Sequence, residues 1–495
     1  MGGEMADIEM ADIRTAVIVV HGMGEQKPLD TLKEFVRTAL KPKDAAAAPE
    51  HRRAYYYSRP ALVSDSYEAR RYIARFLGSP ANPIQGQTEI FEYHWSYMMT
   101  GNRFSDVIPT TLRLVLRPPW KVPVGLRGLW TIVWLVALAA AAAILAVTFY
   151  FPNLGVATRT AVNSSIVAAL VAFAWRKATT GVTASFVDVI RYLDTSPRSY
   201  TARRAIRGGM LDLLRNIHDA GQYTRIVVVA HSLGAYIAYD AMHSLWFELH
   251  ALHADVPAPP QGGQAPLIGL TDLQKAADDL FNKEGSVDAY QTRQFELWKG
   301  LRAQGNPWLI TDFICVGTPM YFADLLLTRN KDEFDNQVRN GQLITCPPRA
   351  GQQEVEEERR PSHVKYWWPH GHAQVLGSGT MFAVVRWTNF WFPAVWSFFG
   401  DWFGGRLAPL FGDGIRDVRI EGNTPGRWLP GFAHSRYFSY PDDDASTAIA
   451  ANIRQTLALD IDLELAAMTV LETDPAMNAQ RLQPQVTWTS GEPAD

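Results

Sequence analysis

The sequence predicts an α/β protein with a mostly parallel, doubly wound sheet. Three observations predict this class. Short apolar segments recur along the chain, helix-forming segments follow several of them, and this alternation covers most of the 495 residues. Strands that alternate with helices are typical of a parallel sheet covered on both faces. A chain of this length that is 47% hydrophobic and 20% charged can also bury a large core.

The first predicted unit is a strand, a glycine turn and a helix. The strand is the apolar run Thr15–Val20, and it leads directly into His21-Gly22-Met23-Gly24. A helix then begins near Pro28, with apolar residues at helical spacing up to Leu40. Such a turn lies at the carboxyl end of its strand, where α/β folds place ligands. An ordinary tight turn is the alternative interpretation.

Further strands are predicted at 89–95, 225–230, 308–316 and 382–390, and further helices at 200–220, 235–249 and 445–459. We expect a strand and a helix within 51–87, and a polar helical pair at 270–304 that is either a lid or an insertion. Residues 1–14 and 471–495 are expected to be flexible ends.

An uncharged segment, Leu129–Phe151, interrupts this pattern. Its length covers the ~30 Å hydrocarbon core of a bilayer at ~1.5 Å per residue, which predicts a transmembrane helix. A fully buried soluble helix is the alternative. A second, shorter apolar stretch follows at Thr160–Trp175. Strands 15–20 and 225–230 stay on one side of a membrane only if the crossings are even in number. We therefore predict a transmembrane hairpin over 118–177, or a hairpin that dips in without spanning.

Positive charge flanks this hairpin. Basic residues precede it (Arg113, Arg117, Lys121 and Arg127) and follow it (Arg176 and Lys177), whereas Arg159 is the one cation in the connecting loop. The positive-inside rule then places both ends of the hairpin, and the folded domain with them, in the cytoplasm. The sequence thus predicts a protein of the cytoplasmic membrane.

Composition excludes several other classes. The net charge of −3 gives no indication of nucleic-acid binding. Two cysteines, Cys315 and Cys346, are too few for a disulfide framework and indicate a reducing compartment. The N-terminal residues carry acids and lack the apolar core of a secretory signal.

The most informative stretch is Ala230-His231-Ser232-Leu233-Gly234. It follows a run of valines and opens an apolar, helix-favouring segment, as in the G-x-S-x-G turn between a strand and a helix. A serine on such a strained turn needs very small residues two positions before and after it. Ala230 and Gly234 meet that need. We interpret Ser232 as a nucleophile, with a plain buried turn as the alternative.

A serine hydroxyl needs a base to become nucleophilic. In the strand-turn-helix arrangement the chain order is serine, then acid, then histidine. Several histidines after Ser232 lie on or just past the helix that follows it, and others precede the strand at 382–390. His434 lies in a loop just ahead of the final helix and is the predicted base, with a surface-loop histidine as the alternative.

The orienting acid should follow a late strand and precede His434. Asp401 in Gly400-Asp401-Trp402-Phe403 is the best candidate. Asp413 and Asp417 are local rivals, and Asp324 is the rival if the acid follows the preceding strand.

Together with Val316-Gly317-Thr318-Pro319, these motifs make the chain resemble a lipase-type serine α/β-hydrolase. The resemblance covers roughly 15–117 and 178–460, within a predicted hydrolase domain of 15–117 and 178–470 that has the membrane segment as an insertion. It implies an oxyanion hole formed by the backbone N–H groups of Met23 and Leu233. His21, Gly22, Gly24, Ala230, His231 and Gly234 are then supports of the turn and the loop. Many lipases have Asp-Pro-Val at the acid, where this chain has Asp401-Trp402-Phe403.

The resemblance implies hydrolysis of a carboxylic ester, with a lipid or another acyl ester as substrate and no cofactor. Acyl transfer or amide hydrolysis by the same triad is an alternative, and so is a non-catalytic membrane scaffold. The aromatic run 387–403 indicates a packed core, and the alternatives are an apolar wall for an acyl chain or an interfacial belt at the membrane. We find no metal-ligand spacing, since His370-Gly371-His372 alone offers too few ligands.

Overall fold

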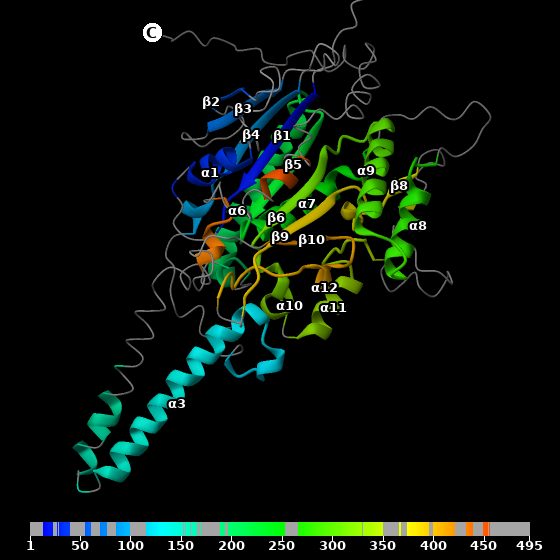
Figure 1. The fold of residues 1–495 in the computed structure, drawn as a ribbon. Helices are drawn as coiled ribbons and strands as arrows, with labels where there is room; N and C mark the ends of the chain where they lie inside the picture. Colours follow the sequence, from blue (N-terminus) through cyan, green and yellow to red (C-terminus); the bar gives the residue numbers. More distant parts are fainter. Residues whose placement is uncertain are drawn as a thin grey trace, which may run out of the picture.

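The computed structural model contains one mixed, mostly parallel eight-stranded sheet with helices packed on both of its faces (Figure 1). Apart from a few positions inside these ranges, the structure describes residues 13–22, 27–39, 55–60, 70–76, 86–99, 115–169, 189–252, 266–349, 366–367, 374–420, 432–438 and 449–455. The α/β class predicted from the sequence is therefore confirmed.

The large sheet has the order β10-β9-β6-β5-β1-β4-β3-β2. Neighbouring strands from β10 to β4 pair in parallel, whereas β3 is antiparallel to both β4 and β2. The strand bounds are β1 (Ile13–Val20), β2 (Tyr55–Pro60), β3 (Arg70–Phe76), β4 (Gly86–Tyr93), β5 (Arg225–His231), β6 (Ile310–Val316), β9 (Arg386–Trp391) and β10 (Arg416–Arg419). A separate pair, β7 (Tyr366–Trp367) and β8 (Val375–Leu376), is antiparallel.

The helices divide between two cores because the central strands are apolar on both sides. In β1, Ile18 and Val20 face the larger core, whereas Val17 and Val19 face the smaller one. Helices α6 (Pro197–Asp219) and α7 (Gly234–Leu249) pack in the larger core, and α1 (Asp30–Ala39) packs in the smaller. Shorter helices are α10 (Ala323–Leu326), α11 (Lys331–Arg339) and α12 (Ala408–Phe411).

Three sequence predictions need correction. Where a strand and a helix were expected within 51–87, the two described segments Tyr55–Pro60 and Arg70–Phe76 are both strands, and Arg70–Phe76 pairs with β4 and β2 on its two sides. Residues 381–383 form a 3₁₀ turn, so β9 begins only at Arg386. The Gln294 side chain, in the preceding segment 270–304, donates to the backbone carbonyls of Phe382 and Val385, which a sheet neighbour would otherwise use. Finally, β1 begins at Ile13, because Ile13 and Arg14 pair with β4.

The segment 270–304 forms two helices, α8 (Leu270–Phe281) and α9 (Val287–Ala303). On α9, the amides of Gln291 and Gln294 donate to the carbonyls of Trp387 and Val385, at the amino end of β9. Ser232 follows the carboxyl end of β5, at the opposite edge of the parallel strands. This packing fits an insertion built into the core and not a lid over the serine.

Helix α3 (Arg127–Tyr150) extends away from the rest of the protein (Figure 1). Within the described residues it lies in the one helical span, Val124–Tyr150, that is long and apolar enough by composition to cross a membrane. None of the most apolar part of this span is buried inside the protein. Residues 156–158 and 160–165 are also helical, whereas most of Thr160–Trp175 lies outside the described residues. The hairpin thus stays a prediction, as do the flexible ends.

The contact between α7 and β1 leads to a first prediction. A Cβ atom on Gly234 would lie 2.6 Å from the Val20 carbonyl oxygen and 2.7 Å from that of His21. Both obstacles are backbone atoms, so Gly234→Ala should destabilise the protein by about 1–3 kcal/mol. Gly208→Ala, on α6, is the matched control because nothing lies within 4 Å of the added methyl group. Thermal unfolding in detergent should show a lower melting temperature for Gly234→Ala alone; equal temperatures for both variants would contradict the prediction.

Candidate active site

Ser232 occupies a sharp turn between β5 and α7. Its φ angle is +54°, a left-handed conformation that a serine rarely adopts. Its backbone N–H donates to the carbonyl of Val316, at the end of the neighbouring strand β6. The turn therefore holds a strained serine at the carboxyl edge of the sheet, as the sequence predicted.

Small residues make this turn possible. Gly234 lets the start of α7 approach the end of β1, as described above. Gly22 lies under the turn, where a Cβ atom would meet the His231 Nδ1 atom at 2.5 Å and the Ser232 Cβ atom at 3.0 Å. Ala230 is fully buried between Val20 of β1 and Cys315 of β6. The predicted supports Gly22, Ala230 and Gly234 thus all lie against the serine or its neighbouring strands.

Ser232, His434 and Asp401 form a continuous hydrogen-bonded triad. His434 lies on the 3₁₀ turn Phe432–Ser435, and its Nε2 atom is 2.8 Å from Ser232 Oγ. Its Nδ1 atom is 3.1 Å from Asp401 Oδ1. With the proton on Nδ1 donated to the carboxylate, Nε2 is left to accept the proton of the serine hydroxyl. The structure brings together three residues that are distant in sequence.

The Asp401 carboxylate is fully buried and surrounded by donors. Its Oδ1 atom accepts from the Phe403 N–H at 2.8 Å, and its Oδ2 atom accepts from the Tyr437 hydroxyl at 2.6 Å. Burial by itself raises the pKa of the carboxyl group, but His434 and the hydrogen bonds lower it below the usual 3.8. Asp401 therefore stays ionised at neutral pH.

Tyr437 is a site residue to which the sequence analysis assigned no role. Its hydroxyl accepts from the Phe392 N–H at 2.9 Å while it donates to Asp401. Its position three residues after His434 was the available signal. The sequence offered no way to tell that its side chain turns back to the acid.

Two histidines, the buried His21 and the half-buried His231, lie at the carboxyl ends of β1 and β5. The Nε2 atom of His231 lies 2.7 Å from the His434 carbonyl oxygen, which links the serine turn directly to the loop of the base. The Nε2 atom of His21 accepts from the Trp95 N–H, and its ring stacks on the Trp95 indole. Burial lowers the pKa of His21 to about 3 and that of His231 to about 4, so both rings are neutral.

The rival acids have other partners. Asp417 accepts hydrogen bonds from the Asn389 amide and from two backbone N–H groups at the start of α12. Asp413 forms an exposed ion pair with Lys283, and Asp324 lies in the first turn of α10. The acid in contact with His434 is Asp401.

The predicted oxyanion donors are only partly described. Leu233 is fully buried directly before the first residue of α7. Met23 and Gly24 lie outside the described residues. The role of Met23 therefore stays a prediction.

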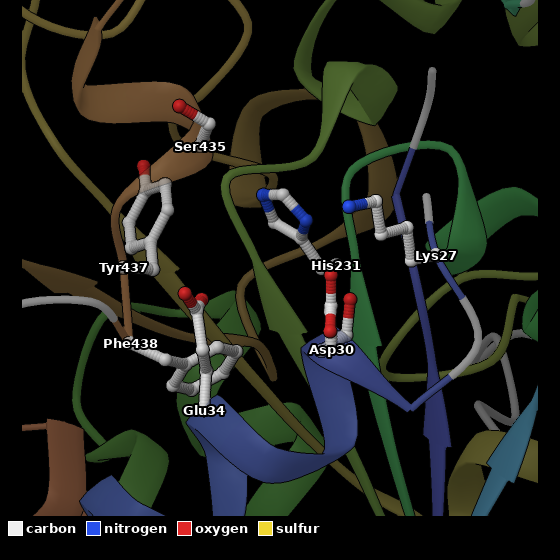
Figure 2. Close-up of a pocket in the computed structure, with 8 residues that line it drawn as sticks. Lys27, Asp30, Glu34, His231, Ser435, Tyr437 and Phe438 are labelled. Atoms are coloured by element: carbon white, nitrogen blue, oxygen red, sulfur yellow. The ribbon is translucent and has the colours of Figure 1, made fainter. Parts of the chain in front are cut away.

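A polar pocket of about 310 Å³ lies beside His231 (Figure 2). Asp30 and Glu34, one helical turn apart on α1, line it together with Lys27, and Ser435 and Tyr437 contribute from the loop of the base. The sequence analysis did not single out this pocket. Among the described residues, no group of three or more histidine, cysteine or acidic side chains is placed to hold a metal ion.

The described aromatic residues near the acid are mostly buried. Trp387, Phe390 and Phe392 are fully buried, and the Phe403 ring lies 4.8 Å from the His434 ring. These positions pack in the core, whereas residues 396–398 lie outside the described residues. The packing fits the core interpretation of this run.

The support of Asp401 by Tyr437 can be tested by its pH dependence. Tyr437→Phe leaves a buried carboxylate oxygen without its donor, so it should cost about 1–3 kcal/mol of stability and raise the pKa of Asp401. A carboxyl group whose pKa is lower in the folded than in the unfolded protein stabilises the fold fully at pH values above the unfolded pKa. That stabilisation is lost as the pH falls through the pKa of the folded protein. The deficit of the variant should thus be complete above the usual pKa of 3.8 and shrink below it. Chemical unfolding at several pH values measures this stability deficit, and Tyr200→Phe, at an exposed tyrosine, is the control. A deficit that does not change with pH would contradict the support of Asp401 by Tyr437.

The chain matches no protein-family model, no curated protein and no solved structure. Among the described residues, the contacts that join Ser232, His434 and Asp401 are the feature of the site most suited to chemistry.

Proposed function

We propose that this protein is a membrane-associated serine hydrolase that cleaves a carboxylic ester through an acyl-enzyme. The single observation that carries the proposal is the buried series of contacts from Ser232 Oγ through the His434 ring to Asp401. A strained serine, a base within hydrogen-bond distance and an ionised acid behind the base are the parts that nucleophilic acyl chemistry needs.

In the proposed reaction, His434 Nε2 takes the proton of Ser232 as Oγ attacks the ester carbonyl carbon. Asp401 stabilises the imidazolium that forms and keeps the ring oriented. The tetrahedral intermediate then expels the alcohol, which receives the proton from His434 as its C–O bond breaks. A water molecule repeats the sequence on the acyl-enzyme, releases the acid and restores the serine.

Charge on the tetrahedral oxygen needs donors close to the serine. We propose the N–H groups of Leu233 and Met23 for this role. Leu233 directly follows the nucleophile, and in the sequence Met23 comes three residues after the end of β1, which pairs with β5. The central serine strand, the mostly parallel sheet and the order serine, aspartate, histidine support an α/β-hydrolase fold for this domain.

Membrane attachment is part of the proposal. Helix α3 is apolar and long enough to cross a bilayer, and beyond its first turn none of its most apolar part is buried in the protein. Arg117, Lys121 and Arg127 precede its apolar part, which supports a cytoplasmic position for the catalytic domain. A lipid or another acyl ester at the membrane is the proposed substrate.

Covalent labelling tests the enzymatic part of the proposal. A fluorophosphonate probe should label the wild-type protein in membranes, and Ser232→Ala should abolish the label. His434→Ala should slow labelling strongly, because loss of the base of such a triad can cost about 10⁶ in kcat. Asp401→Asn should also slow it, whereas the exposed Asp413→Asn should label at the wild-type rate. Labelling that persists in Ser232→Ala would contradict the proposal.

A panel of phospholipid, glyceride, short-chain ester and amide substrates would separate ester hydrolysis from amide hydrolysis.

Fractionation tests the membrane part separately. Deletion of Leu129–Trp175 should move the protein to the soluble fraction, because it removes the apolar segment that a bilayer would hold. Labelling of the soluble variant at Ser232 is the control for correct folding. A labelled variant that still sediments with membranes would show that the anchor lies elsewhere.

A further inference from the structure

The start of the apolar helix packs directly against the loop that contains the triad acid. Val122 and Leu126, just before α3, are buried in the larger core, so the root of the helix is part of the folded domain. Gly125 lies between them on the 3₁₀ turn Val124–Leu126. A Cβ atom at Gly125 would come within 2.4 Å of both the Trp402 carbonyl oxygen and the Tyr321 hydroxyl. Glycine is therefore required by the close approach of this loop.

Tyr321 joins the two segments. The Tyr321 hydroxyl lies closely against Gly125, where a Cβ atom would meet it, and it donates to the Trp402 carbonyl at 3.0 Å. The ring of Tyr321 is also held tightly, since a Cβ atom on Gly405 would lie 2.5 Å from it. Tyr321 thus lies between the helix root and the loop of residues 401–405.

This loop contacts the base at two points. Asp401, directly before Trp402, binds His434 Nδ1, and the Phe403 ring packs on the His434 ring. A displacement of the Trp402 backbone would therefore move both contacts together. Reaction rates respond steeply to such shifts, since a misplacement of 1 Å can cost about 10²-fold.

We propose that Gly125 and Tyr321 form a positioning contact through which the membrane helix holds Asp401 in register with His434. The inference rests on the proposed function and adds a structural dependence of the triad on the anchor. Both residues act through the loop of residues 401–405, which makes them positioning residues and not catalytic ones. Figure 1 places α3 on the side of the domain toward which the carboxyl ends of the parallel strands point.

The experiment uses the full chain reconstituted in liposomes, with a short-chain p-nitrophenyl ester as substrate. Gly125→Ala should lower kcat about tenfold or more with KM within about twofold, because the added methyl displaces the acid loop and leaves substrate contacts in place. Gly155→Ala is the matched control, since nothing lies within 4 Å of its added methyl group. Its kcat should equal that of the wild type.

A second variant keeps the inference testable if Gly125→Ala does not fold. Tyr321→Phe keeps the ring and removes the hydroxyl that joins Gly125 to Trp402, and it should lower kcat by about threefold or more at unchanged KM. The fraction of protein that the fluorophosphonate probe finally labels reports how much is folded. The inference is overturned if both variants match Gly155→Ala in kcat, or if KM alone changes. A wild-type protein without Ser232-dependent activity overturns the proposed function itself, and this inference with it.

Discussion

The hydrogen bond between His434 and the buried Asp401 carboxylate is the interaction on which the site depends. A carboxylate without access to water is stable only if donors surround it, and Asp401 has the His434 ring, the Tyr437 hydroxyl and the Phe403 N–H. These donors hold the Asp401 carboxylate, Asp401 holds the ring of His434, and that ring reaches Ser232. One buried charge thus orders three loops.

Small and neutral residues surround Ser232, His434 and Asp401, because the segments that hold them pack closely and one charge is already buried there. Gly22 and Gly234 permit the close approach of β1, α7 and the serine turn, which a methyl group would prevent. The neutral ring of His231 joins the serine turn to the carbonyl of His434 without adding a second charge. Gly125 extends this packing to the root of α3, so the apolar helix and the acid loop share a boundary.

The sequence predicted the α/β class and the position of the serine turn well, because both depend on local patterns. Continuous apolar strands, a small-residue turn and a following helix are visible over short windows. It failed at 382–385 and at Arg70–Phe76, where distant partners decide the conformation. Carbonyls bonded by Gln294 from α9 stop β9 from starting earlier, and pairing on both sides makes β3 a strand.

By itself the sequence determined the apolar strands, the strained Ser232 turn, the uncharged helix and the candidates for base and acid. Only the tertiary structure decided among Asp401, Asp413, Asp417 and Asp324, because each acid follows a strand or a loop in a plausible position. The tertiary structure also places the Tyr437 hydroxyl in a hydrogen bond with Asp401 and brings Gly125 against the backbone of Trp402. These contacts depend on which side chains meet at the carboxyl edge of the sheet. Segments that are far apart in the sequence meet there, and such contacts produce no periodic pattern in a single sequence.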